Sequence, residues 1–232
     1  MENNSLLNDA RQYLIEFLKG KQHRFETKHP WRKEWEFAVS HSLRVERYVV
    51  KILERESHQL SKTEITLLRL AAILHDIGRL EITDDHARLG AAIAKEWLSE
   101  NRSHELNDVQ IEHVVEMIVQ HSDKDGVENN FSKAVLKDAD TLDEIGAMSI
   151  FMSSNWIDRK SPFFFQELLQ RLKDFEIPFC EDKETKLNTK GAREILEEKK
   201  AFIEGFIIQL ENELEADAQL EQFLKNSRAN GS

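Results

Sequence analysis

A histidine and an aspartate stand side by side at the end of the most apolar run in this sequence. His75 and Asp76 follow residues 67–74, in which Arg69 is the only charged residue. An imidazole and a carboxylate at the inner end of a buried helix are costly to remove from water unless something pairs with them. A divalent cation is a suitable partner, because both donor types bind such metals. Adjacent helical side chains point about 100° apart, so both reach one ion only where the helix loosens, and Gly78 favours such an ending.

Further metal-ligand candidates lie on both sides of this pair. His41 falls on the apolar stripe of a helical pattern, where a buried histidine that serves the core alone is the alternative interpretation. Asp138 and Asp140 are two residues apart and face away from each other on a helix, so at most one of them is expected to bind the metal. The spacing does not choose between these two aspartates.

The elements that must position these residues are helices. The chain of 232 residues contains only 8 glycines and 3 prolines, which disfavours sheets with many tight turns. Ser61 and Glu64 form a capping-box pattern for the helix that ends at His75. The remaining expected features are a helix over 5–19, a loop over 23–35, a helix over 36–55, helix starts at Asp84 or Asp85, at Asn107 or Asp108, at Ser132 and at Ser161-Pro162, a long final helix with apolar positions from Ile195 to Leu214, and fraying from about Asn226.

Composition narrows the class of protein. No apolar run is long enough to span a membrane, and the start of the chain lacks the features of a signal peptide. Cys180 is the only cysteine, which excludes an internal disulfide and fits the cytoplasm. The formal net charge of −11 disfavours broad nucleic-acid binding. A small phosphorylated ligand remains compatible with this charge if a metal and a few basic residues reverse its sign locally.

The order of the motifs resembles the HD superfamily of metal-dependent phosphohydrolases. A histidine precedes the His75-Asp76 pair and an aspartate follows at a distance, and the resemblance covers roughly residues 36–150. It includes the segments His41-Ser42-Leu43-Arg44-Val45, His86-Ala87 with Gly90-Ala91, and Ile118 to His121. The segment Lys186-Leu187-Asn188-Thr189, with Arg193, Phe202 and Phe206, is also similar to small bacterial HD proteins that cleave nucleoside triphosphates.

The resemblance implies an all-α fold, an HD-domain helical bundle with a C-terminal helical extension. We expect the core over residues 1–150 and the extension, packed on it as part of one unit, over 151–232. A divalent ion (Mn, Mg, Fe, Ni or Zn) would be held by the four residues His41, His75, Asp76 and Asp140. Among these, Asp76 would also orient the attacking water. The choice of Asp140 leaves Asp138 as a surface residue.

Other residues are candidates for binding substrate phosphate. Arg44 lies one turn after His41, and its guanidinium suits a phosphate oxygen; a surface salt bridge to Glu36 or Glu46 is the alternative. The other candidates are Arg79, His86, His121, Lys137 and Asp143. Ordinary capping and packing are the alternatives for the two histidines. Asp143 shares a face with Asp140, so it either supports the ligands or is a solvated carboxylate.

These residues predict a divalent-metal-dependent phosphohydrolase that acts on a nucleotide or a related small phosphorylated molecule. The leading subtype is a nucleoside-triphosphate pyrophosphohydrolase; the alternatives are a phosphomonoesterase or phosphodiesterase, and a metal-binding signalling module without turnover. Gln120-His121 stands where two-metal HD members carry paired histidines, which disfavours a two-metal mechanism and cyclic-dinucleotide hydrolysis. The sequence does not determine which metal binds or whether Lys186 and Arg193 reach the site. A homodimer is possible.

Overall fold

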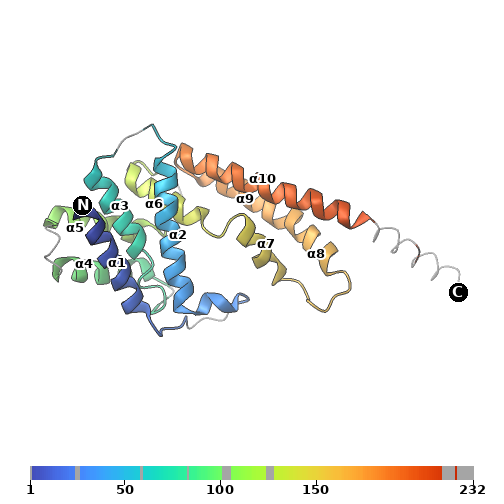
Figure 1. The fold of residues 1–232 in the computed structure, drawn as a ribbon, viewed down its shortest axis with the longest axis horizontal. Coiled ribbons are helices and arrows are strands. Elements are labelled where there is room, and N and C mark those ends of the chain that lie inside the picture. The colour runs from blue at the N-terminus through green and yellow to red at the C-terminus, as the bar shows by residue number, and fades with distance from the viewer. Residues whose placement is uncertain are drawn as a thin grey trace. The chain divides into compact units, whose positions relative to one another are not determined.

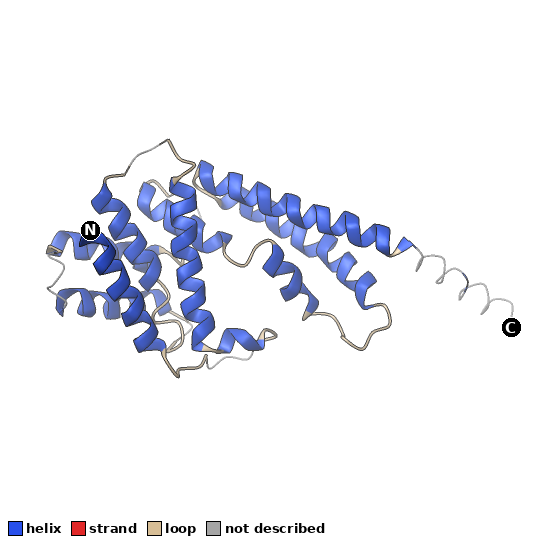
Figure 2. Cartoon of the chain, viewed as in Figure 1, coloured by secondary structure: helices blue, strands red, loops and turns tan. Residues whose placement is uncertain are grey.

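A computed structural model of the protein describes residues 2–23, 27–57, 60–82, 84–100, 106–123, 128–215 and 223. These residues form helices, turns and loops, and the only β pairing among them is an isolated antiparallel bridge between Gln22 and Glu34 (Figure 2). The all-α prediction is therefore confirmed. Within these ranges, no helix combines the length and apolar character that a membrane crossing requires. The fraying expected from about Asn226 falls outside the described residues.

The chain divides into two compact units. The first consists of Met1–Asp143 together with Lys183–Ile195, and the second of Glu144–Asp182 together with Leu196–Ser232. The chain thus leaves the first unit after Asp143 and later returns to it through a short segment. These units divide the chain after Asp143, Asp182 and Ile195, whereas one boundary, after residue 150, was expected from the sequence.

The first unit is a helical bundle in which α3 contacts α1, α2, α4, α5 and α6. Eight of the thirteen residues of α3 are buried, so this helix forms the centre of the core. The helices can be followed by label in Figure 1: α1 (Glu2–Leu18), α2 (Trp35–Leu53), α3 (Lys62–Leu74), α4 (His86–Glu100), α5 (Asp108–Gln120) and α6 (Phe131–Leu142). A short 3-10 helix, η1 (Pro30–Lys33), lies in the segment expected to be a loop.

Side-chain caps set where several helices begin. Ser61 and Glu64 form the expected capping box at the start of α3. Asn107 caps α5 in the same way, with Gln110 as its partner. The expected start at Ser132 is wrong by two residues, because the Asn130 side chain accepts the Lys133 N–H at 3.1 Å and caps α6. Asparagine is a strong N-cap residue, which is consistent with this start.

The second unit contains the segments α7 (Ala147–Ser154), α8 (Phe164–Arg171), the π-helical turn η3 (Leu172–Glu176) and parts of α9 (Ile177–Lys186) and α10 (Lys190–Glu213). The start of α8 lies two residues after the expected Ser161-Pro162. The Ser161 hydroxyl accepts the Phe163 N–H at 3.2 Å, so these residues form a turn before the helix. Both α9 and α10 cross a boundary between the units.

Candidate metal centre

Three imidazoles in the first unit are held in the same way. Their Nδ1 atoms lie 2.7 Å from Asp143 Oδ2 for His41, 2.8 Å from the Ala72 carbonyl for His75 and 2.6 Å from the Ile118 carbonyl for His121. A carboxylate and a carbonyl only accept, so each Nδ1 carries the proton and donates it. In the neutral ring each Nε2 then presents a lone pair, which is the form of histidine that binds metals.

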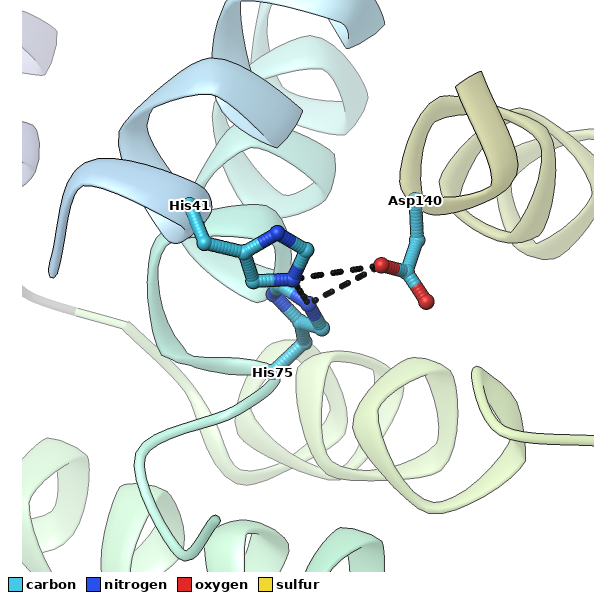
Figure 3. A group of neighbouring side chains, drawn as sticks. All are labelled: His41, His75 and Asp140. Atoms are coloured by element: carbon cyan, nitrogen blue, oxygen red, sulfur yellow. Dashed lines mark hydrogen bonds and ion pairs between the residues drawn. The ribbon is translucent and has the colours of Figure 1, made fainter. Parts of the chain in front are cut away.

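Two of these Nε2 atoms converge with Asp140 (Figure 3). Nε2 of His41 lies 3.2 Å from Nε2 of His75 and 3.2 Å from Asp140 Oδ1, and the third separation, from His75 Nε2 to Asp140 Oδ1, is 3.7 Å. Adjacent ligands at about 2.1 Å from an ion lie roughly 3.0–3.4 Å apart in octahedral or tetrahedral geometry. Two of the three separations lie in this range and the third is 0.3 Å longer, so the three donor atoms lie close enough to share one cation after a small adjustment. They come from α2, the end of α3, and α6.

Asp76 faces this cluster with one oxygen and a second group of histidines with the other. Its Oδ2 lies 3.5 Å from His41 Nε2, while Oδ1 lies 3.3 Å from His86 Nε2 and 3.4 Å from His121 Nε2. Oδ1 is buried and has no hydrogen-bond partner among the described residues. A buried acceptor left in this state is costly, and a cation would satisfy it. His75, Asp76 and His121 also have the spacing of a metal-binding group.

The site concentrates negative charge around His41. Burial opposes protonation of this ring, but hydrogen bonds to Asp140 and Asp143, together with the charges of Asp140 and Asp76, raise its pKa to about 10. Burial would raise the pKa of Asp76, yet the charge of His75 and the approach of His121 and His86 hold it well below its ordinary value. The carboxylates thus favour a positive charge at their centre, which a bound cation supplies.

The end of α3 explains how neighbouring residues face one site. The helix ends at Leu74, and turns follow in which the Arg79 N–H donates to the Asp76 carbonyl at 2.9 Å. A Cβ atom on Gly78 would lie 2.7 Å from the Gly90 nitrogen and 2.8 Å from the His86 carbonyl oxygen. Glycine is needed here because the backbone of α4 packs directly on this turn. That approach brings His86 to Asp76.

Arg44 does not form the salt bridge that was the alternative to a phosphate contact. Its Nε and Nη2 lie 2.7 and 2.8 Å from the two oxygens of Asp143, and Nη1 donates to Ser40 Oγ at 2.8 Å. The salt bridge proposed as its alternative, with Glu36 or Glu46, is therefore wrong. Asp143 is 6% exposed, which also rules out a solvated carboxylate. It bridges Arg44 and His41. Burial would raise the pKa of Asp143, but its contacts with His41 and Arg44 outweigh burial and hold this pKa below the ordinary value.

The remaining cationic candidates differ in accessibility. Lys137 is buried, and its Nζ donates to Glu128 Oε2 at 2.9 Å. Arg79 keeps 42% of its side chain exposed, while Nη1 lies 2.9 Å from His86 Nε2 and 3.9 Å from Asp76 Oδ1. Arg79 is thus the more accessible of the two to an arriving anion.

The prediction from the sequence is wrong about one residue of this region, Asp138, and does not identify a second, Arg32. Asp138 is 1% exposed and binds Asn188 and Thr189, so the expectation of a surface residue is wrong. Arg32, in η1, was not singled out. Burial and the positive charges of Arg79 and Arg44 lower the pKa of Arg32, whereas the charge of Asp143 raises it. Arg32 is therefore one of several cationic side chains near the carboxylates of the site. In the sequence, only the basic composition of residues 23–35 indicates that Arg32 could lie near a charged site.

Comparison with known proteins places a family match and several similar folds on this chain. Residues 38–145 match the family model described as the HD domain. Bacillus subtilis YpgQ in complex with ADP is 21% identical, with a TM-score of 0.60 over 93% of this chain and 98% of that one. A predicted HD superfamily hydrolase from an uncultured Thermotogales bacterium is 22% identical, with a TM-score of 0.60 over 89% and 92% of the two chains.

An HD-superfamily hydrolase from Bacillus thuringiensis is 19% identical, with a TM-score of 0.59 over 92% of this chain and 99% of that one. At these identities the solved structures establish a shared fold. Among curated proteins, none matches the chain. The family match spans His41, His75, Asp76 and Asp140, the residues that the structure brings together. Residues 38–145 are an HD domain.

Proposed function

We propose that this protein is a divalent-metal-dependent phosphohydrolase whose metal is held by His41, His75, Asp76 and Asp140. The observation that carries this proposal is the convergence of the His41 and His75 Nε2 atoms on Asp140 Oδ1, within 3.2–3.7 Å of one another. An acceptor at Nδ1 orients each of these rings so that its neutral form presents the Nε2 lone pair to the cation. Two imidazole nitrogens and two carboxylates suit a borderline divalent ion.

The protein residues around the ligands have separate tasks. Such a cation supplies charge neutralisation at a phosphoryl group and acidifies water. Asp143 fixes the ring of His41, and Arg44 fixes Asp143. Asp76 Oδ1, which has no hydrogen-bond partner among the described residues, is an acceptor that can orient a water molecule. The partly exposed side chain of Arg79 binds a phosphate oxygen and offsets charge that develops there.

His86 and His121 surround the second oxygen of Asp76. His121, together with His75 and Asp76, provides donors for a further cation, whereas His86 Nε2 lies 2.9 Å from Arg79 Nη1. The replacement of a histidine by Gln120 therefore does not leave this side of the site without ligands. In the absence of a second cation, these histidines serve the substrate, as Arg79 does. Counting the bound ions distinguishes the two roles.

The proposed substrate is a nucleotide or a related small phosphorylated molecule, and the leading reaction is cleavage of a nucleoside triphosphate to a monophosphate and pyrophosphate. Two observations support a nucleotide. YpgQ, whose fold this chain shares, was crystallised with ADP. The segment from Lys186 to Thr189, with Arg193, resembles that of HD proteins that cleave nucleoside triphosphates. Phosphomonoester and phosphodiester hydrolysis are the alternatives, as is a signalling module that binds metal without turnover. Such a protein would act in the cytoplasm, and a homodimer stays a prediction.

The experiment begins with metal-stripped protein reconstituted in parallel with Mn²⁺, Mg²⁺, Fe²⁺, Ni²⁺ or Zn²⁺. Each form is incubated with nucleoside mono-, di- and triphosphates and with a phosphodiester, and phosphorus NMR identifies the products. Pyrophosphate and nucleoside monophosphate support the leading reaction, whereas stepwise orthophosphate supports a phosphomonoesterase. Metal binding without any turnover across the panel would favour the non-catalytic module. A His75→Ala variant, prepared identically, controls for a contaminating phosphatase.

A further inference from the structure

The buried carboxylate of Asp138 is bound by a segment fifty residues away in the sequence. Its oxygens accept hydrogen bonds from the Asn188 N–H at 3.0 Å, Asn188 Nδ2 at 3.0 Å, the Thr189 N–H at 2.7 Å and Thr189 Oγ1 at 2.7 Å. Asp138 is 1% exposed and Thr189 is 4% exposed. A buried carboxylate that is fully surrounded by donors fixes the position of the backbone that carries it.

The donors lie at the start of α10, in the segment that returns to the first unit. Thr189 also accepts the Ala192 N–H at 3.3 Å, so one hydroxyl caps α10 and donates to Asp138. Arg193 closes the same turn by donating to the Leu187 carbonyl at 2.6 Å. These contacts give the segment one defined shape against α6.

A second connection joins this segment to the same helix. The Asn188 side-chain oxygen accepts the Glu128 N–H at 2.9 Å, and the Glu128 carboxylate accepts from Lys137 Nζ at 2.9 Å. Lys137 directly precedes Asp138 in α6. Asn188 therefore holds the middle of α6 both directly and through Glu128.

The residue that α6 contributes to the metal cluster is Asp140, two positions after Asp138. On a helix these two side chains point to different sides, so one can face the returning segment while the other faces the histidines. A rigid helix transmits a shift or rotation at Asp138 directly to Asp140. Ligand geometry is sensitive to such shifts, because donors must lie within a few tenths of an ångström of their ideal positions.

We propose that Asn188 and Thr189 are positioning residues for the metal centre, which set the placement of Asp140 by clamping Asp138. This inference rests on the proposed metal centre and adds the returning segment to the residues that determine its affinity. It explains why α6 carries a buried aspartate where an apolar residue would fill the core without the cost of burying a charge.

The test compares variants of Thr189 that keep or remove the hydroxyl. Thr189→Val preserves the shape of the side chain and loses its hydrogen bonds, whereas Thr189→Ser keeps them. Metal-stripped proteins are titrated with Mn²⁺ and Co²⁺ by calorimetry, and the Co²⁺ absorption spectrum reports ligand geometry. We expect affinity to fall roughly tenfold or more in Thr189→Val, in the range known for residues that orient ligands, and to stay near wild type in Thr189→Ser.

A matched control loosens the same segment without touching Asp138. Glu56 accepts the Gly191 N–H at 2.5 Å, close to the end of α2. Glu56→Ala should lower the melting temperature and leave metal affinity and the Co²⁺ spectrum unchanged. If Thr189→Val does not fold, Asn188→Ala replaces it, since Asn188 is only partly buried and its loss removes the side-chain donor to Asp138.

Unchanged metal affinity in folded Thr189→Val or Asn188→Ala would overturn the inference. An equal loss of affinity in Glu56→Ala would also overturn it, because the segment would then act through general stability. Failure of the wild-type protein to bind either metal is a different result and would contradict the proposed function itself.

Discussion

Asp143 Oδ2 lies 2.7 Å from Nδ1 of His41 and fixes the ring so that Nε2 faces His75 and Asp140. The same carboxylate is held from the other side by the guanidinium of Arg44. Replacing Asp143 by asparagine removes the charge from this connection. We expect metal affinity to fall roughly 10- to 100-fold in Asp143→Asn, measured by calorimetric titration of metal-stripped protein. Affinity equal to that of wild type would show that Asp143 does not support the ligand.

Arg44→Lys keeps the positive charge and loses the two-pronged contact with Asp143. Lysine is a point charge and cannot reproduce this geometry, so we expect hydrolysis efficiency to drop roughly tenfold, or about 1.4 kcal/mol of transition-state stabilisation. Arg47→Lys, an exposed exchange three residues later in α2, is the matched control and should have no effect. A similar loss in both variants would mean that the position of Arg44 is not special.

His75→Ala tests whether the metal serves catalysis or folding. His75 is fully buried and its Nε2 is one of the converging donors, so the variant should lose metal and turnover. Because α3 buries eight residues in the core, we expect the fold to persist without the ion: circular dichroism should show the helical content of wild type, with stability lowered by about 1–3 kcal/mol. Global unfolding of His75→Ala would instead identify a structural metal.

Gly78→Ala tests the close approach of α4 to the turn after Asp76. The added Cβ would meet the Gly90 nitrogen at 2.7 Å and the His86 carbonyl oxygen at 2.8 Å, and backbone atoms cannot move aside cheaply. We expect a loss of about 1–3 kcal/mol in the free energy of unfolding, measured by urea denaturation.

Gly205→Ala is the control for this exchange, because nothing lies within 4 Å of a Cβ atom there. Gly205 is exposed within α10, and alanine in a helix interior should stabilise by about 0.5–1 kcal/mol. Equal effects of the two exchanges would contradict the close packing at Gly78.

Cys180 provides a prediction about pH. Burial, followed by the charge of Glu176, raises the pKa of this thiol to about 11 despite the nearby Lys200 and Lys199. The folded protein therefore disfavours the thiolate, and this contribution to stability is present at neutral pH and is lost as the pH rises from about 9 towards 11. At pH 8 a disulfide reagent should label native protein slowly and urea-unfolded protein rapidly. Equally fast labelling of the native protein would show that the thiol is accessible.

The sequence predicts local features of this fold well. Ser61 and Glu64 lie three residues apart, and the capping box that they form follows from this spacing alone. The scarcity of glycine and proline correctly disfavoured sheets with many tight turns. The order of His41, His75-Asp76 and Asp140 pointed to residues that the structure brings together, because this order is a property of the family.

Contacts between distant segments were not predictable in this way. Asp138 finds its partner Asn188 fifty residues later, and Arg44 finds Asp143 ninety-nine residues later. Helical spacing predicts which side chains share a face of a helix, but it does not predict which other segment of the chain packs on that face. A buried, bonded aspartate and a solvated one therefore have the same local signature, and Asp138 was assigned to the surface.

Calorimetric titration of metal-stripped protein with Mn²⁺, followed by a phosphorus NMR assay of the same sample with a nucleoside triphosphate, tests the central claim most directly. The convergence of His41, His75, Asp76 and Asp140 predicts at least one tightly bound ion per chain and metal-dependent release of a phosphorylated product. Absence of binding, with Mn²⁺ and with the other four metals, would contradict the metal centre and the phosphohydrolase activity together.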